Sequence, residues 1–465
     1  MKTINKDILK LALPSILANI TVPLVGMVDI AVAGHLDASA ATMIGGIAIG
    51  SMLFDLLYWN FGFLRVGTGG LAAQAFGRGD RKECAHILAR AVGIALICAA
   101  VLISVQWVFI NSAFMFVDCT DEVRQLASDY FFIRIWAAPA TLSLMAMKGW
   151  FIGMQDSVSP MITDIVVNIG NIVMSIILTL GFSVGEINIE GIGFNGVAAG
   201  TLVAQYSGLA VAVFLLVIRY RRNTFSHYDI RNLSTLFKGH QTRRFFEMNA
   251  DLFVRSLCFI AIYIGFTVIS ARYGDLLLAV SSIMMKLLMI FSYFTDGFAY
   301  AGEALTGRYI GAGDRTMVKT SVRWTFIWSM GIALVFIAIY HFAGVSMLKV
   351  MTTDEAVVRA SVEYLPWLLL MPVAGCAAFT WDGVYIGATA SRQMRNSMLW
   401  AVVAFAAVWF VGIFALAVLS EKQTVAHNQC DGLAMHILMA AYFAHLLART
   451  VYLTVKARKS VFSAI

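Results

Sequence analysis

Long apolar stretches separated by short polar breaks make up the chain from end to end. Met43–Tyr58, Ala91–Ile110, Ile165–Phe182 and Asn195–Ile218 are four of them, each with only a few polar interruptions. A helix needs about 20 apolar residues to cross the core of a bilayer. The breaks predict twelve membrane-spanning helices, near 8–34, 45–77, 86–117, 123–153, 160–182, 194–219, 244–271, 276–310, 319–350, 357–388, 394–420 and 432–456.

The composition supports a membrane-embedded chain. Of the 465 residues, 60% are hydrophobic and 13% are charged, whereas a soluble domain carries about 25% charged residues. The six cysteines show neither a CxxC pair nor metal-ligand spacing. Cys119 and Cys430 fall in predicted outside loops, which leaves a disulfide between them open.

The net charge of +7 reflects topology rather than nucleic-acid binding. Lys and Arg alternate between a rich and a poor side of the predicted membrane, with 22 on one side and about five on the other. Basic residues concentrate in cytoplasmic loops. Both termini and the long segment 221–243 are therefore expected in the cytoplasm. Nucleic-acid binding would need a basic surface on a folded soluble domain, and none is predicted.

Residues 234 positions apart match repeatedly, which predicts two related halves. Gly77–Arg81 resembles Gly311–Arg315, and Ile152-Gly153 is repeated as Ile386-Gly387. Six helices per half is an even number, so both halves share one orientation, as in transporters with a parallel repeat. We expect an all-α integral membrane protein of two pseudo-symmetric six-helix bundles: 1–220 with helices 1–6, a cytoplasmic linker 221–243, and 244–465 with helices 7–12.

Asp29 is the most unusual charge in the sequence. It lies deep in the first helix, with no Lys or Arg within two turns on either side. Ionisable residues inside a membrane are costly, and those that remain usually face a cavity or a partner. Asp29 is either a coupling carboxylate, which takes up protons or Na⁺, or a neutral structural residue. Pro14 and Pro23 in the same helix remove backbone hydrogen bonds and could kink it.

Further polar residues lie within the predicted helices. Helix 5 carries Asp164, Asn168, Asn171 and Ser175 on one face, which indicates either a cavity wall or a helix–helix contact. The others are interpreted mainly as structural ion pairs. In this group, Asp251 and Arg255 form an i,i+4 pair on helix 7, and Asp296 and Glu303 share a face of helix 8 with Lys286 nearby. Asp55 and Arg65 lie on helix 2, and Arg65 could pair with a carboxylate of helix 7 or 8.

At the level of short motifs, the chain resembles the multidrug and toxic compound extrusion (MATE) transporters. Leu11–Pro14, Pro23–Asp29 and Gly34–Leu36 look like helix 1 of that family. Gly69–Gly77 and Asp296–Leu305 look like its DinF-like branch. The resemblance implies a twelve-helix, two-lobe exporter with a central cavity. It also implies exchange of cationic or amphipathic compounds for H⁺ or Na⁺.

The resemblance also assigns residues. Asp29 matches the family's helix 1 acid, Pro14 its helix 1 proline, Asn171 its helix 5 asparagine and Thr201 a helix 6 threonine. The family often has a second acid four residues after that asparagine, where this chain has Ser175. Asp164 lies on the same face but about 16 Å nearer the cytoplasm, at 1.5 Å per residue. Asp29 would then act with neutral ligands, which favours protonation over tight Na⁺ binding.

The expected function is cation-coupled export of cationic or amphipathic small molecules across the cytoplasmic membrane. The protein would be a lipid-embedded monomer without a cofactor. One alternative is a lipid-linked precursor flippase of the same superfamily, which would need a large basic cavity, and only Arg65, Arg255 and Lys286 qualify. A membrane enzyme or redox subunit is the other, and it would need paired histidines. Only His436 and His445 lie mid-helix, both in helix 12.

Overall fold

The computed structural model describes residues 2–34, 40–115, 117, 119–184, 187–222, 224, 240–352, 354–421 and 430–463. These residues are helical apart from turns and one two-stranded hairpin. By length and hydropathy, twelve described segments can cross a membrane, the first over Thr3–Asp29 and the last over Cys430–Ser460. The predicted all-α membrane fold with twelve spans is confirmed.

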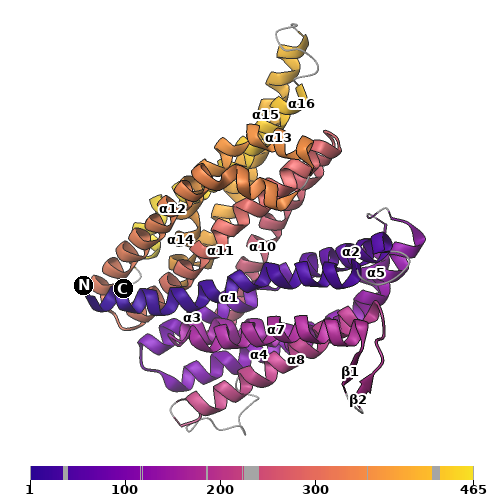
Figure 1. Cartoon of the computed structure of the whole chain (residues 1–465). Helices are drawn as coiled ribbons and strands as arrows, with labels where there is room; N and C mark the ends of the chain where they lie inside the picture. Colours follow the sequence, from indigo (N-terminus) through magenta and orange to yellow (C-terminus); the bar gives the residue numbers. More distant parts are fainter. Residues whose placement is uncertain are drawn as a thin grey trace. The chain divides into compact units, whose positions relative to one another are not determined.

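The chain divides into two compact units (Figure 1). The N-terminal unit covers Leu13–Phe246. After the shared helix α1 (Lys2–Gly34), its elements are α2 (Ala40–Trp59), α3 (Gly62–Gly77), α4 (Arg81–Ala113), α5 (Asp121–Arg134), the 3₁₀ turn η1 (Ile135–Ala137), α6 (Ala138–Gly153), α7 (Val158–Leu180), β1 (Phe182–Val184), β2 (Ile187–Ile189) and α8 (Asn195–Tyr220). The antiparallel hairpin pairs Phe182 with Ile189 and was not predicted.

The C-terminal unit covers Glu247–Ile465 together with Met1–Ala12. Its elements are α10 (His240–Ala271), α11 (Asp275–Gly311), α12 (Arg315–Met351), α13 (Glu355–Glu363), α14 (Leu365–Gly387), α15 (Ser391–Glu421) and α16 (Cys430–Ser460). The start of α1 belongs here because Ile4 and Ile8 are buried and the indole N–H of Trp328 donates to Asn5 Oδ1 at 3.1 Å. No feature of the sequence predicted this placement.

Three predicted spans are interrupted rather than continuous. Asn60 and Phe61 separate α2 from α3, where Asn60 Nδ2 donates to the carbonyl of Leu56 at 2.7 Å. The fourth span changes to a 3₁₀ turn just before Pro139, and the tenth breaks at Tyr364, before a proline in the first turn of α14. A proline fits the start of a helix but lacks the N–H that would continue an earlier one. Helix α1, in contrast, continues through Pro14 and Pro23.

Local backbone structure repeats at the same spacing of 234 residues. Gly79 and Gly313 both adopt a positive φ, of +75° and +72°, a conformation that glycine tolerates best. The next residue in each case, Asp80 or Asp314, caps the following helix by accepting from a backbone N–H three residues on, at 2.9 Å. Aspartate is a preferred N-cap residue. The repeat seen in the sequence is therefore also a repeat of chain geometry.

Equivalent glycines also allow equivalent helix contacts. Gly149 on α6 packs against the backbone carbonyl of Arg65 on α3, and Gly383 on α14 packs in the same way against the carbonyl of Ala299 on α11. A Cβ atom at either glycine would overlap that carbonyl oxygen. Small residues let membrane helices approach this closely. Each unit thus packs its second and fourth spans backbone to backbone.

Each unit has its own aromatic core. In the N-terminal unit, the rings of Phe54 and Phe131 stack with centroids 5.0 Å apart. In the C-terminal unit, Phe291 and Phe336 meet edge to face at 5.4 Å. All four side chains are buried. Cys119 is a free thiol, so the disulfide with Cys430 that the sequence left open is not formed.

Asp156 lies in the turn between α6 and α7 and connects the start of α7 with the end of α8. Its carboxylate accepts from the Ser159 hydroxyl at 2.6 Å, from Arg219 Nη1 at 2.9 Å and from the Tyr220 hydroxyl at 3.1 Å. Burial alone would raise the pKa of this carboxyl. The hydrogen bonds from Ser159 and the hydrogen bond and charge of Arg219 outweigh burial and hold the pKa of Asp156 below its ordinary value.

Candidate functional site

Asp29 is buried in the N-terminal unit, near the end of α1. Within the described residues, its Oδ1 atom has no hydrogen-bond partner. Ser175 on α7 lies within hydrogen-bonding reach of the carboxyl group, and Arg134 on α5 is close enough to interact with its charge. A buried carboxyl oxygen without a partner is costly in a folded protein. Asp29 is therefore placed to gain a proton or a ligand.

A chain of neutral hydrogen-bonding groups surrounds Ser175. Asn171 Nδ2 donates to Thr201 Oγ1 at 2.8 Å, and the Ser175 hydroxyl lies 3.4 Å from Asn171 Oδ1. All three side chains are buried. The close approach of α7 and α8 requires Gly200, where a Cβ would lie 2.5 Å from the Ser175 backbone nitrogen. The structure thus brings Asn171, Ser175 and Thr201 together, with Ser175 facing Asp29.

Arg134 is the member of this site that the sequence did not reveal. Its Nη1 donates to the Tyr130 hydroxyl at 2.8 Å, and its guanidinium lies 4.7 Å from the centre of the Phe54 ring. Its charge interacts with Asp29 and, more weakly, with Asp55 on α2. The available signal was a lone arginine at the end of the aromatic stretch Tyr130–Arg134. Asp29 lacks a basic neighbour on its own helix, but the fold supplies one from α5.

Asp164 does not provide a free second acid. It pairs with Lys148 of α6, with Nζ 2.6 Å from Oδ2, and each side chain is about a quarter exposed. An ion pair of this kind neutralises the carboxylate. Asn168, on the same face of α7, instead donates to the Thr21 hydroxyl of α1. The polar stripe on α7 thus makes helix contacts along much of its length and reaches Asp29 at Ser175.

The expected pairing of Asp251 with Arg255 is wrong. Asp251 accepts from Arg395 Nη1 at 2.6 Å and from the Ser391 hydroxyl at 2.8 Å, both at the start of α15. Arg255 instead bonds Asp382 on α14 at 2.6 Å. Two side chains one turn apart on α10 therefore reach two different helices, because each finds an oppositely charged partner across the bundle.

Asp382 is shared between two arginines. Besides Arg255, it accepts from Arg449 Nη2 at 2.5 Å, and the Arg449 side chain is only 2% exposed. Asp296 and Glu303 lie on α11 as predicted, with Glu303 fully buried and Asp296 half-buried. The polar cluster predicted for the C-terminal unit is therefore not one group. Its two α10 residues form separate ion pairs, Asp251 with α15 and Arg255 with α14.

The remaining predicted residues belong to α1, α2 and α3 of the N-terminal half. Asp55 is exposed on α2, and Arg65 is half-buried on α3. The pairing of Arg65 with a carboxylate stays a prediction, as does a kink at Pro14 or Pro23. In the described part of the chain, no group of three or more His, Cys, Asp or Glu side chains could hold a metal ion.

Comparisons with known proteins agree on one family. The family model MatE matches residues 14–177 and 252–411. The chain is 34% identical over 402 residues to DNA damage-inducible protein F of Escherichia coli, covering 86% of this chain and 84% of that one. It is 22% identical over 416 residues to the probable multidrug resistance protein NorM of Photorhabdus laumondii, covering 88% and 86%.

A solved structure shares the fold. It is described as the outward-facing conformation of a multidrug resistance MATE family transporter of the MOP superfamily. The TM-score is 0.81 at 15% sequence identity, and the match covers 99% of this chain and 96% of the other. At this identity the likeness concerns the fold alone.

Proposed function

The chain belongs to the multidrug and toxic compound extrusion (MATE) family of membrane transporters, and from this premise we propose that it is a proton-coupled antiporter. It would export cationic or amphipathic small molecules. The observation that carries the proposal is the Asp29 carboxyl, buried in a membrane span with Oδ1 unpartnered among the described residues. Buried ionisable groups in membrane spans commonly form proton relays in transporters.

The surroundings of Asp29 favour a proton over Na⁺ as the coupling ion. A hard metal cation needs several oxygen ligands at once. The neutral groups next to Ser175 bond one another: Thr201 Oγ1 accepts from Asn171 and donates to the carbonyl of Val197 at 3.2 Å, so Na⁺ would have to compete with these bonds. The positive charge of Arg134 also acts on Asp29 and would repel a metal cation. A proton needs only one carboxyl oxygen, and Oδ1 supplies it.

Arg134 gives the two protonation states different interactions. The ionised Asp29 carboxylate is stabilised by the guanidinium of Arg134, whereas the neutral acid loses most of that attraction. Proton uptake therefore weakens the electrostatic attraction between Arg134 on α5 and the end of α1. Pro23, six residues before Asp29, lies in the same helix and lacks the N–H of a regular turn. We infer that α1 changes shape when Asp29 is protonated from the outside and that substrate then leaves outward.

The C-terminal unit is a weaker candidate for coupling. Its membrane-embedded Asp382 is held by Arg255 and by the buried Arg449. Breaking such a buried pair is strongly destabilising. The same contact weighs against a lipid-linked precursor flippase, since it commits Arg255 to a carboxylate rather than to a diphosphate.

The distribution of basic residues supports an orientation with both termini in the cytoplasm of a bacterial-type inner membrane. In that orientation each proton that enters is driven by about 2.3 kcal/mol per 100 mV, in addition to any pH gradient. The antiporter would work as a monomer, since each chain contains both repeats.

Efflux from proteoliposomes under separately imposed proton and Na⁺ gradients tests the proposal directly. We expect efflux of a cationic dye under the proton gradient and its loss in Asp29→Asn. The matched control is Asp121→Asn, which makes the same chemical change at the exposed start of α5. Undiminished proton-driven efflux by Asp29→Asn would remove Asp29 from the mechanism, and efflux driven only by Na⁺ would overturn proton coupling.

A further inference from the structure

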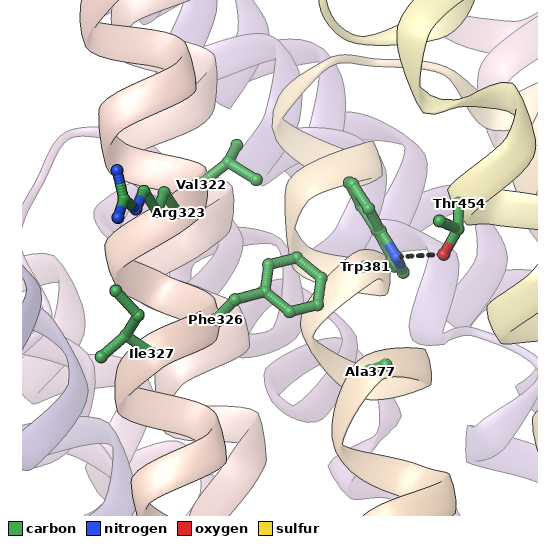
Figure 2. A pocket seen from close by; sticks show the side chains of 7 residues that line it. All are labelled: Val322, Arg323, Phe326, Ile327, Ala377, Trp381 and Thr454. Atoms are coloured by element: carbon green, nitrogen blue, oxygen red, sulfur yellow. Dashed lines mark hydrogen bonds between the residues drawn. The ribbon is translucent and has the colours of Figure 1, made fainter.

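A groove opens between three helices of the C-terminal unit. It has a volume of about 530 Å³, within the range of small-molecule sites. Figure 2 shows side chains of α12, α14 and α16 around it. Those that matter here are Arg323, Phe326, Ile327, Ala377, Trp381 and Thr454. The groove is distinct from the Asp29 site, which lies in the other unit.

The walls of the groove are apolar, and their one buried donor is already used. The Phe326 and Trp381 rings meet edge to face at 4.8 Å. The indole N–H of Trp381 donates to Thr454 Oγ1 at 2.9 Å, drawn as the dashed line in Figure 2. Ile327 is 45% exposed. An occupant would therefore meet hydrocarbon surface along most of its length.

Arg323 provides the charge at the rim. Its side chain is exposed, and no carboxylate or other partner engages it among the residues that the structure describes. In contrast, Arg255, Arg395 and Arg449 of the same unit are all held by aspartates. Arg323 is thus free to bind an anion.

The length of α12 places the groove near the expected depth of the lipid headgroups. Helix α12 has 37 residues and is about 55 Å long, whereas a hydrocarbon core is about 30 Å thick. About 12 Å at each end therefore extends beyond the core. Arg323 is eight residues, or about 12 Å, from the start of α12. Phe326 and Ile327 lie about one turn further along α12, where the hydrocarbon core is expected to begin.

We propose that this groove binds a phospholipid with an anionic headgroup, such as phosphatidylglycerol. The headgroup phosphate pairs with the Arg323 guanidinium, and an acyl chain lies along Phe326, Ile327 and Ala377. Basic pockets between membrane helices on the cytoplasmic side are suited to anionic headgroups. A free phosphate ion would use the charge but not the apolar wall, and a zwitterionic lipid would use the wall with less benefit from the charge.

Native mass spectrometry of the purified protein tests the choice of ligand. We expect phosphatidylglycerol to bind more tightly than phosphatidylcholine, and Arg323→Ala to weaken phosphatidylglycerol binding about fivefold, the change for about 1 kcal/mol per basic residue at a membrane surface. The control is Arg315→Ala, at the exposed start of the same helix, which should leave binding unchanged. Equal binding of both lipids, or displacement by millimolar inorganic phosphate, would overturn the proposal.

A second measurement locates the lipid even if Arg323→Ala does not fold. Phosphatidylglycerol brominated on its acyl chains should quench tryptophan fluorescence of the wild-type protein in nanodiscs more than it quenches Trp381→Phe. That variant keeps an aromatic ring beside Phe326, but it removes the indole fluorophore and its hydrogen bond to Thr454. Brominated phosphatidylcholine should show a smaller difference between the two proteins. No difference between them with the anionic lipid contradicts a chain in this groove.

Discussion

Lys148 and Asp382 occupy equivalent positions 234 residues apart, yet they carry opposite charges. Lys148 is held by Asp164 at 2.6 Å. Asp382 is held by Arg255 at 2.6 Å and by Arg449. Each unit therefore has an ion pair at this position of its fourth span. The fourth span contributes the cation in the N-terminal unit and the anion in the C-terminal unit. Their geometry is repeated, but their electrostatics are not.

Replacing Lys148 with methionine should destabilise the protein, because it leaves Asp164 unpaired inside the membrane. Fully buried pairs cost about 3–5 kcal/mol when one partner is removed. Here both side chains are about a quarter exposed, so we expect about 1–3 kcal/mol after allowing for solvent screening. Thermal unfolding in detergent measures the change. The swapped double variant Lys148→Asp, Asp164→Lys should recover part of the loss, and an unstable swap with a stable Lys148→Met would contradict the pairing.

Asp382→Asn should have a larger effect. It removes the charge that neutralises two arginines, one of which is 2% exposed, and breaking a buried pair costs about 3–5 kcal/mol. The control is Arg359→Ala, whose pair with Glu355 is at least 80% exposed on both sides and should change the unfolding temperature little. Similar unfolding temperatures for both variants would show that the pairs around Asp382 do not hold the unit together.

Arg134→Met should move the pH dependence of transport. The substitution removes the positive charge that acts on the ionised Asp29 carboxylate, so the pH of half-maximal efflux should shift. Proteoliposome efflux measured across a pH series reports this value. Arg134→Lys preserves the charge and should stay closer to the wild type. An unchanged pH profile in Arg134→Met would separate Arg134 from the coupling step.

Alanine at Gly383 should destabilise the C-terminal unit, because the new Cβ would overlap the carbonyl oxygen of Ala299. Overpacking of this kind costs about 1–3 kcal/mol, and Gly149→Ala should behave alike in the other unit. Gly331 on α12 has nothing within 4 Å of an added Cβ. Gly331→Ala should therefore be neutral or stabilise by up to about 1 kcal/mol through helix propensity. Thermal unfolding of the three variants measures these free-energy changes. Equal unfolding temperatures for Gly383→Ala and Gly331→Ala would contradict the close approach of α14 to α11.

Asp156 should make a pH-dependent contribution to stability. Its pKa is lower in the folded protein than the ordinary value of 3.8, so folding favours the ionised form. The contribution is complete above the unfolded pKa and is lost as the pH falls through the folded pKa. Asp156→Asn should unfold at a lower temperature than the wild type at pH 7, and the gap should narrow below about pH 4. A gap that is constant down to pH 3 would show that the carboxylate charge is not involved.

Much of the candidate site could be read from the chain. Asp29 stands out because a carboxylate in an apolar span is costly, and the spacing of Asn171 and Ser175 places them on one face of α7. Thr201 came from the family resemblance. Arg134 was not predicted as a site residue because it lies on α5, whereas the rest of the site lies mainly on α1 and α7. Its role depends on the rotation of α5, which no local pattern encodes.

The sequence by itself determined the twelve spans, the all-α fold and the 234-residue repeat. These follow from hydropathy and length, because a bilayer imposes the same thickness on every span. Only the tertiary structure decided which charges meet: Asp251 with Arg395, Arg255 with Asp382, and Asp164 with Lys148. It also assigned Met1–Ala12 to the C-terminal unit. The reason is physical: crossing a membrane is a property of each segment alone, whereas the partner of a side chain depends on how the helices around it pack and turn.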